Sequence, residues 1–261
     1  MPEIVTPQAT LHVEIDGDGE PVTVLAHGLT NSCRELAAFT PLVPGTKVRF
    51  CFRGHGHSRT SPDAGFRFAD FADDLEAVAD AYGATCAVGT SLGAGAIGNL
   101  LTRRPDRFER MVFLLPAGLD RPFQYKERFH HMASQVQGRT PEQAVDALLS
   151  DTERVNEYLA MPWRIELDRA LWEHGEPDAL ARAIRGVIED FPVSDRELLR
   201  AVTAPVLLIC VDDDPIHPVE LGRILADLLP NAELMEYANV EELFSAIAAI
   251  AQRVAAFLAE A

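Results

Sequence analysis

The chain has 261 residues, of which 48% are hydrophobic and 24% charged, proportions expected of a soluble globular protein that buries a large core. Forty acidic against 23 basic side chains give a formal net charge of −17, which opposes binding to phosphate backbones and to anionic lipid surfaces. The composition therefore argues against nucleic acid and membrane partners. It leaves a small-molecule substrate or ligand as the expected partner, and it leaves the oligomeric state open.

Neither the N-terminus nor the cysteines indicate export. The segment Met1–Ile4 lacks a basic region followed by an apolar stretch, and no run of about 18 apolar residues occurs in the chain. The four cysteines, Cys33, Cys51, Cys86 and Cys210, form no C-x-x-C pair, and three lie within or beside apolar runs. We expect a cytoplasmic location and free, buried thiols, although disulfide pairing stays possible in principle.

Apolar runs of strand length alternate with longer segments of helical period, which is typical of a mostly parallel sheet covered on both faces. Strands are predicted at Leu11–Ile15, Val22–Ala26, Lys47–Phe52, Cys86–Thr90, Arg110–Leu115, Val206–Cys210 and Glu233–Tyr237. Helices are predicted at Phe68–Tyr82, Leu92–Arg103, Glu220–Leu229 and Glu241–Leu258. The pattern indicates the α/β class.

About 90 residues separate the strand that ends at Leu115 from the one that begins at Val206, far more than one crossover helix requires. The stretch Phe123–Asp195 has a helical pattern and carries aromatic and apolar side chains: Phe123, Phe129, Met132, Leu148, Leu149, Tyr158, Leu159, Trp163 and Trp172. We predict a helical cap at residues 119–195 over the C-terminal edge of the sheet. Residues 1–118 and 196–261 would then form the core.

The sequence Gly89-Thr90-Ser91-Leu92-Gly93 is a G-x-S-x-G motif between a predicted strand and a predicted helix. Small residues flank a serine in this way where a tight, strained turn lifts its hydroxyl above the edge of a sheet. The N-terminus of the following helix favours developing negative charge. The motif predicts that Ser91 is a nucleophile.

A second apolar strand ends in His27-Gly28-Leu29, where glycine lets the chain bend so that the next backbone N–H faces the serine. An acyl-transfer site needs two such donors for the oxyanion. We expect them to be the backbone N–H groups of Leu29 and Leu92. His27 is expected to make structural hydrogen bonds at the turn and not to act as a base.

Together with Arg53-Gly54-His55-Gly56-His57-Ser58, these segments resemble the α/β-hydrolase superfamily over almost the whole chain. The likeness is to the esterase, lactonase and carbon–carbon-bond hydrolase branch with a helical cap. It implies an α/β-hydrolase fold, hydrolysis of an ester, lactone or related carbonyl compound, and a structural role for His55 and His57. Neither a clustered set of metal ligands nor a phosphate-binding glycine loop is apparent, so no metal or organic cofactor is expected.

The segment Ala204–Pro218 resembles the part of that superfamily in which an apolar strand is followed by the acid of the catalytic triad. The resemblance implies that Asp214 is the acid. Val211 replaces the usual glycine, however, so the path of the loop is uncertain and Asp212 or Asp213 could serve instead.

The resemblance also implies a histidine after the last strand, but the corresponding position is Val240, and no histidine follows His217. Three explanations stay open. His217, three residues beyond Asp214, is the replacement base, with His130 and His131 as alternatives. The protein uses the oxyanion pocket without a full triad, which leaves about 10³ to 10⁴-fold catalysis over water in known cases. Or it is a catalytically silent binder of small molecules.

Overall fold

The computed structural model describes residues 2–38, 41–151, 162–172 and 175–260. The described residues form one sheet in the strand order β1-β2-β4-β3-β6-β7-β8-β9, with the short β5 paired to β2. β2 runs antiparallel to β1, β4 and β5, and the pairs from β4 through β3, β6, β7 and β8 to β9 are parallel. The mostly parallel sheet predicted from the apolar runs is confirmed.

The strands are β1 (Glu3–Val5), β2 (Ala9–Asp16), β3 (Val22–Ala26), β4 (Thr46–Phe50), β5 (Arg59–Thr60), β6 (Cys86–Thr90), β7 (Arg110–Leu114), β8 (Val206–Val211) and β9 (Ala232–Tyr237). Every residue of β3 and β8 is buried. Such continuous burial is typical of parallel strands with helices on both faces, and it explains why these strands read as unbroken apolar runs.

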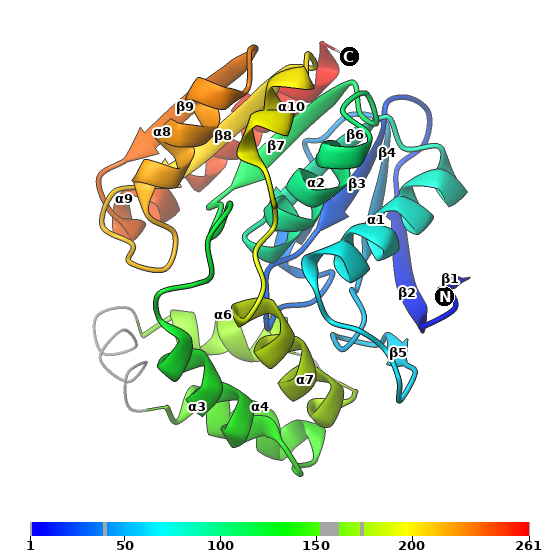
Figure 1. The fold of residues 1–261 in the computed structure, drawn as a ribbon, viewed down its shortest axis with the longest axis vertical. Coiled ribbons are helices and arrows are strands. Elements are labelled where there is room, and N and C mark those ends of the chain that lie inside the picture. Colours follow the sequence, from blue (N-terminus) through cyan, green and yellow to red (C-terminus); the bar gives the residue numbers. More distant parts are fainter. Residues whose placement is uncertain (1, 39–40, 152–161, 173–174, 261) are drawn as a thin grey trace.

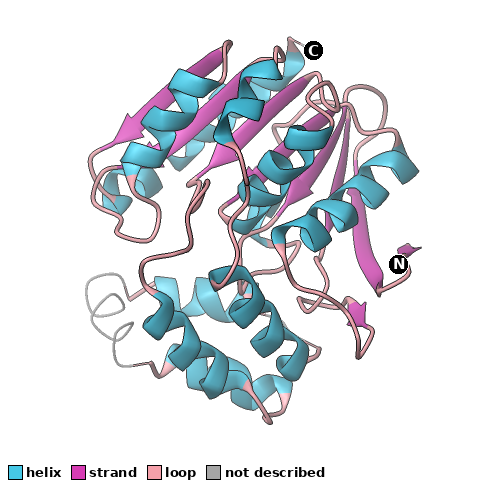
Figure 2. Ribbon diagram, in the orientation of Figure 1, coloured by secondary structure: helices cyan, strands magenta, loops and turns pink. Residues whose placement is uncertain are grey.

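Helices α1 (Phe68–Tyr82), α2 (Leu92–Arg103) and α8 (Val219–Leu228) pack with Val24 of β3 in one apolar cluster, whereas α9 (Val240–Ser245) and α10 (Ile247–Ala259) pack with Leu25 in another. Because successive side chains of a strand point to opposite faces, the two clusters lie on opposite sides of the sheet. Figures 1 and 2 show this sandwich of helices around the sheet.

The C-terminal helix differs from the prediction, because the expected continuous helix Glu241–Leu258 is two helices that meet at Ala246. Asn239 caps α9 by accepting a hydrogen bond from the Glu242 N–H at 2.8 Å. The break lets α9 turn its apolar side toward the cavity described below while α10 packs on the sheet.

The long segment between β7 and β8 is helical, as predicted. It contains α3 (Lys126–Val136), α4 (Pro141–Leu149), α6 (Arg164–Leu171) and α7 (Pro177–Ile188), and no strand occurs in its described residues. These helices share an apolar core that includes Phe129, Leu148 and Trp172. Figure 1 shows them as a separate layer beside the sheet. Tyr158 and Leu159 lie outside the described residues.

Two side chains of the helical insertion accept hydrogen bonds from the sheet domain. Asp190 accepts from the N–H of Phe68 at the start of α1 at 2.9 Å, and Glu176 accepts from the N–H of Thr60 at 3.0 Å. The insertion is therefore tied to the core at both ends of α7. Among the described residues, the structure contains no helix of the length and apolar character that crossing a membrane requires. All four cysteines are buried free thiols.

Candidate active site

Ser91 lies between β6 and α2 with φ 48° and ψ −103°, a backbone conformation that residues other than glycine rarely adopt. Its N–H donates to the Leu114 carbonyl at 2.9 Å, and its own carbonyl accepts from the Gly95 N–H at 3.0 Å. These bonds hold a strained turn, of the kind that costs of the order of 1–3 kcal/mol and occurs at functional sites.

The glycines on either side of Ser91 are required by close backbone contacts. A Cβ atom on Gly93 would lie 2.2 Å from the Ala26 carbonyl oxygen at the end of β3, and one on Gly89 would lie 2.5 Å from the carbonyl carbon of Gly93. The first turn of α2 is therefore pressed against two strands. This packing fixes the position from which the Ser91 hydroxyl projects.

His217 reaches Ser91 from the loop that follows β8. Its Nε2 lies 3.1 Å from the Ser91 Oγ, and its Nδ1 lies 2.7 Å from Asp214 Oδ2. The His217 and Asp214 side chains are 18% and 15% exposed, so the chain of hydrogen bonds is largely shielded from water. The Ser91 hydroxyl thus contacts an imidazole that is in turn oriented by a carboxylate. This is the arrangement of a nucleophile, a base and an acid.

The short loop from Asp214 to His217 is held by the same carboxylate that contacts the ring. Asp214 Oδ1 accepts from the N–H of Ile216 at 2.9 Å and from the N–H of His217 at 3.2 Å, which leaves Oδ2 for the imidazole. Burial alone would raise the pKa of Asp214, but the hydrogen bonds from His217 and from these amides outweigh burial and lower the pKa. Asp214 is therefore a carboxylate at neutral pH.

The other acids and histidines considered from the sequence make different contacts. Of the three adjacent aspartates, only Asp214 bonds to an imidazole. His130 lies 3.3 Å from Glu189, and His131 lies 2.9 Å from Gln135, both on the exposed side of the cap. The structure does not bring either cap histidine into the cavity that contains Ser91.

His27 is buried and makes the structural contacts expected of it. Its Nε2 accepts from the Phe52 N–H at 3.0 Å, and its Nδ1 lies 2.7 Å from the Gly28 carbonyl. The same carbonyl accepts from the Asn31 N–H at 3.2 Å, which closes a turn with Thr30 at φ 70°. His27 is therefore part of the scaffold of the loop that carries Leu29.

Leu29 and Leu92 line the same cavity as Ser91. Within the described part of the chain, the backbone N–H of neither residue has a protein acceptor. For Leu92 this follows from its place as the first residue of α2, where an amide has no partner inside the helix. Two donors without a protein acceptor, in residues that line the cavity of the hydroxyl, are what a developing oxyanion requires.

A cavity of about 630 Å³ opens in front of Ser91, between the sheet and the helical insertion. Its walls are mostly apolar and come from α3, α6, α7, α9 and the strand ends; they include Leu36, Phe123, Phe129, Met132, Trp163, Trp172, Ile188, Ile216, Leu243 and Phe244. Arg128, Arg164 and Asp168 add polar groups on the cap side. The volume and the lining are those of a site for a small, largely apolar molecule.

Residues 24–245 match the family described as the alpha/beta hydrolase fold, and this range includes Leu29, Ser91, Asp214 and His217. The chain belongs to the α/β-hydrolase family. The sequence is 27% identical over 246 residues to a pimeloyl-[acyl-carrier protein] methyl ester esterase of Chromobacterium violaceum, covering 87% of this chain and 89% of that protein. It is also 27% identical to a putative non-heme bromoperoxidase, BpoC, of Mycobacterium tuberculosis, with 87% and 88% covered.

Solved structures of α/β-hydrolases show the same fold. The enol-lactonase of Burkholderia xenovorans LB400 superposes with a TM-score of 0.80 at 21% identity, covering 99% of this chain and 100% of that one. A hydrolase of Pseudomonas aeruginosa gives a TM-score of 0.78 at 22% identity, with 98% and 97% covered. The predicted α/β-hydrolase fold is confirmed.

Sequence reasoning missed Glu35, an acidic residue that contacts the loop carrying Leu29 in this α/β-hydrolase. Its Oε2 accepts from the Gly28 N–H at 2.6 Å, its Oε1 contacts the Asn31 amide, and it lines the cavity. Burial and the nearby Asp168 raise the pKa of Glu35 to about 7, against the lowering effect of the two hydrogen bonds. Glu35 lies seven positions after Gly28, and no motif marks it.

Val240, where the resemblance led us to expect a histidine, is the first residue of α9 and lines the same cavity. Its apolar side chain belongs to the wall formed with Leu243 and Phe244. In this α/β-hydrolase the imidazole beside the serine therefore comes from the loop after β8.

Proposed function

We propose that this chain is a serine hydrolase that cleaves an ester, a lactone or a related carbonyl compound through Ser91. The observation that carries the proposal is the chain of hydrogen bonds from Ser91 Oγ to His217 and from His217 to Asp214. A serine hydroxyl is a weak nucleophile until a base accepts its proton, and this arrangement supplies the base and the acid that orients it.

The chemistry follows from these positions. Ser91 Oγ attacks the carbonyl carbon while His217 Nε2 takes the hydroxyl proton, and Asp214 stabilises the resulting imidazolium. The negative charge on the carbonyl oxygen is met by the N–H groups of Leu29 and Leu92. His217 then gives the proton to the leaving oxygen, and water hydrolyses the acyl-enzyme by the reverse sequence of transfers.

The apolar cavity supports a substrate whose acyl or alkyl part is hydrophobic. The names of the relatives include a methyl ester esterase and an enol-lactonase, both of which act on carbonyl esters. The apolar cavity and the reactions of these two relatives both support hydrolysis of an ester or lactone.

One feature favours the alternative of a catalytically silent binder, namely valine at position 240, where the family spacing calls for histidine. The two functions differ in the reactivity of Ser91. An activated serine reacts with a fluorophosphonate, whereas a hydroxyl in a mere binding pocket does not.

The test is therefore labelling by a fluorophosphonate probe, measured as the increase in intact mass. We expect one label per chain, no label in Ser91→Ala, and little label in His217→Ala. Hydrolysis of nitrophenyl esters of increasing acyl length should fall about 10⁴-fold in His217→Ala and in Asp214→Asn. An unlabelled wild type, together with no measurable ester hydrolysis, would decide for the binder.

A further inference from the structure

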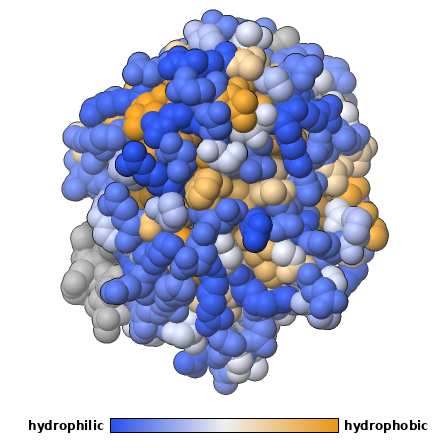
Figure 3. All heavy atoms as spheres, in the orientation of Figure 1, coloured by the Kyte–Doolittle hydropathy of each residue, from blue (hydrophilic) through white to orange (hydrophobic). Residues whose placement is uncertain are grey.

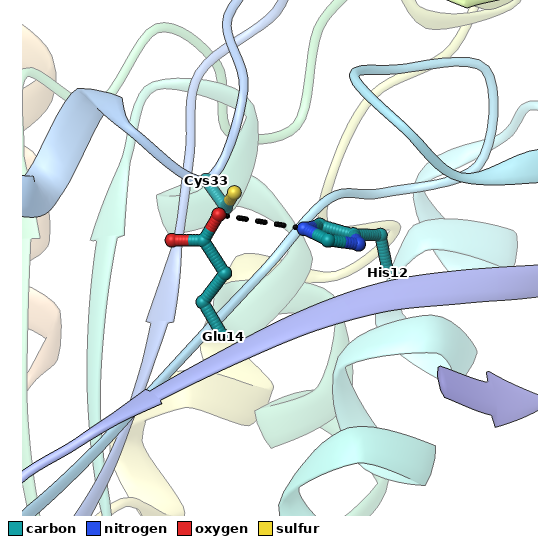
Figure 4. A group of neighbouring side chains, drawn as sticks. All are labelled: His12, Glu14 and Cys33. Atoms are coloured by element: carbon teal, nitrogen blue, oxygen red, sulfur yellow. Dashed lines mark hydrogen bonds and ion pairs between the residues drawn. The ribbon is translucent and has the colours of Figure 1, made fainter. Parts of the chain in front are cut away.

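We infer that His12, Glu14 and Cys33 form a metal site, which the chemistry of its donors suits to Zn²⁺. One ring nitrogen of His12, one carboxylate oxygen of Glu14 and the Cys33 Sγ all lie within 4.8 Å of one another. Figure 4 shows the three side chains converging, with the imidazole and the carboxylate joined at 3.4 Å. None of the three lines the cavity of the candidate active site.

The fold brings the three donors together from two segments. His12 and Glu14 are alternate residues of β2, so their side chains project from the same face of that strand. Cys33 belongs to the loop that follows β3 and carries Leu29; this loop leads into a short 3-10 helix that begins at Glu35. The Cys33 N–H contacts the Cys51 Sγ at 3.4 Å, which places the loop over the end of β4.

The carboxylate of Glu14 is divided between two partners. Oε1 faces His12, whereas Oε2 accepts from Arg49 Nη1 at 3.0 Å. Arg49 also donates to the Cys33 carbonyl at 3.4 Å and is itself paired with Asp16. Arg49 therefore holds a ligand carboxylate and the backbone of a ligand cysteine, as outer groups around metal sites commonly do.

The three donors are largely shielded from solvent, which favours binding of a metal ion. His12 is 5% and Cys33 4% exposed, and Glu14 is partly exposed, which leaves a path for an ion. A divalent metal binds Cys33 as its thiolate and releases the thiol proton to solvent. A dication with one thiolate and one carboxylate is then neutral, which lowers the cost of burying it.

The types of donor select the ion. Mg²⁺ and Ca²⁺ prefer shells of oxygen ligands, whereas a set with one sulfur, one nitrogen and one oxygen suits Zn²⁺. Three protein ligands leave a fourth tetrahedral position for water. An ion bound by the three donors would link the loop that follows β3 to β2. No metal was expected from the sequence, because Cys33 lies 19 positions beyond Glu14 and the three donors form no spaced motif.

The test uses the full chain with its metal removed by chelation and its thiols kept reduced by a phosphine. Co²⁺ is the probe, because a thiolate ligand gives a charge-transfer band in the near ultraviolet. We expect saturation at one Co²⁺ per chain and loss of the band when Zn²⁺ is added. Cys33→Ser should abolish the band, and Glu14→Gln should weaken Zn²⁺ binding at least tenfold.

Cys86→Ser is the matched control, since Cys86 is also a buried thiol but belongs to β6 and lies outside the group; it should keep the band and the affinity. Circular dichroism and fluorophosphonate labelling report whether each variant is folded. Glu14→Gln retains an acceptor for Arg49 and tests the site even if Cys33→Ser does not fold. A wild type without the band, or a band that persists in Cys33→Ser, would overturn the assignment.

Discussion

Glu35 accepts a hydrogen bond from the backbone in a buried position that disfavours its negative charge. Its hydrogen bond to the Gly28 N–H fixes the peptide between His27 and Gly28, one peptide before the Leu29 amide that we propose as an oxyanion donor. Burial and Asp168 nevertheless favour the protonated acid. We propose that Glu35 is a positioning residue whose protonation state varies around neutral pH.

The raised pKa makes a prediction about stability. Because Glu35 keeps its proton to about pH 7 when folded but only to about pH 4.5 when unfolded, the folded state binds more protons in this window. The contribution of Glu35 to the free energy of unfolding should therefore be largest below pH 4.5 and should decline as pH rises through 7. Glu35→Gln, which carries no charge, should gain stability relative to wild type between pH 5 and pH 8.

Urea denaturation at several pH values measures this difference, with Glu127→Gln, an acid in the first turn of the cap helix α3, as the control. A constant difference between wild type and Glu35→Gln across the window would contradict the raised pKa.

The imidazole that contacts Ser91 comes from His217 and not from α9, which begins at Val240. If His217 replaces the histidine that the family carries at the position of Val240, the two positions should be partly interchangeable, since both line the cavity with Ser91. The double variant His217→Ala/Val240→His should hydrolyse nitrophenyl esters faster than His217→Ala alone, by at least tenfold. Equal rates would show that a base at α9 cannot reach both Ser91 and Asp214.

At this scale the sequence predicts residues whose role is encoded by neighbours in the chain. The flanking glycines made Ser91 the expected nucleophile. The lack of any later histidine made His217, three residues beyond Asp214, the first of three explanations that stayed open. Glu35 could not be predicted, because its contacts with Gly28 and Asn31 in the preceding loop form no motif. The group around Cys33 could not be predicted, because His12 and Glu14 come from a different strand. The contact of His217 with Ser91 spans 126 positions, so its geometry needed the fold.

Among the elements, the junction of β6 and α2 carries the tightest requirement. A methyl group on Gly93 would meet the carbonyl oxygen of Ala26, a backbone atom that cannot move without displacing β3. Gly93→Ala should therefore destabilise the protein by about 3 kcal/mol, as overpacking does, and should reduce fluorophosphonate labelling of Ser91.

Gly98→Ala in the same helix is the matched control. The nearest atom to its added methyl group would be Val193 Cγ2 at 3.8 Å, an ordinary contact, and alanine favours the helix by up to about 1 kcal/mol. Urea denaturation of the two variants gives the comparison. Equal stability would mean that the elbow tolerates a side chain at Gly93.

Elements with a long and clear period were predicted well. α1 and α2 begin and end where the apolar pattern places them, and the strands β3 and β6 coincide with their apolar runs. The short edge strands β1 and β5 were not predicted, since three and two residues carry too little alternation. The break at Ala246 was also missed, because no glycine or proline marks it.

For the whole molecule, the dominant feature is the excess of negative charge. Figure 3 shows one face covered mostly by hydrophilic residues, with apolar residues scattered among them. A net charge of −17 on a chain of this size makes the folded state repel itself, in spite of ion pairs such as that of Arg103 with Asp73 and Glu76.

Screening should relieve this repulsion. Raising sodium chloride from about 10 mM to about 150 mM shortens the Debye length from about 30 Å to about 8 Å, so the Tm should rise by several degrees. Calorimetry in the presence of a chelator, which removes any effect of bound metal, measures the change. A Tm that falls with salt would show that the surface ion pairs outweigh the net repulsion.

Asp214 and His217 lie on the same loop after β8, so a displacement of that loop moves both of them relative to Ser91. Asp214 accepts hydrogen bonds from two backbone amides of its own loop, so Asp214 and His217 are held together after β8. Ser91 lies at the end of β6. Between β6 and β8 lies one strand, β7, which is hydrogen-bonded to both. The alignment of His217 with Ser91 therefore depends on how β6 and β8 are held against β7. It also depends on the cap, because Ile216 of the same loop packs against the apolar core of the cap helices.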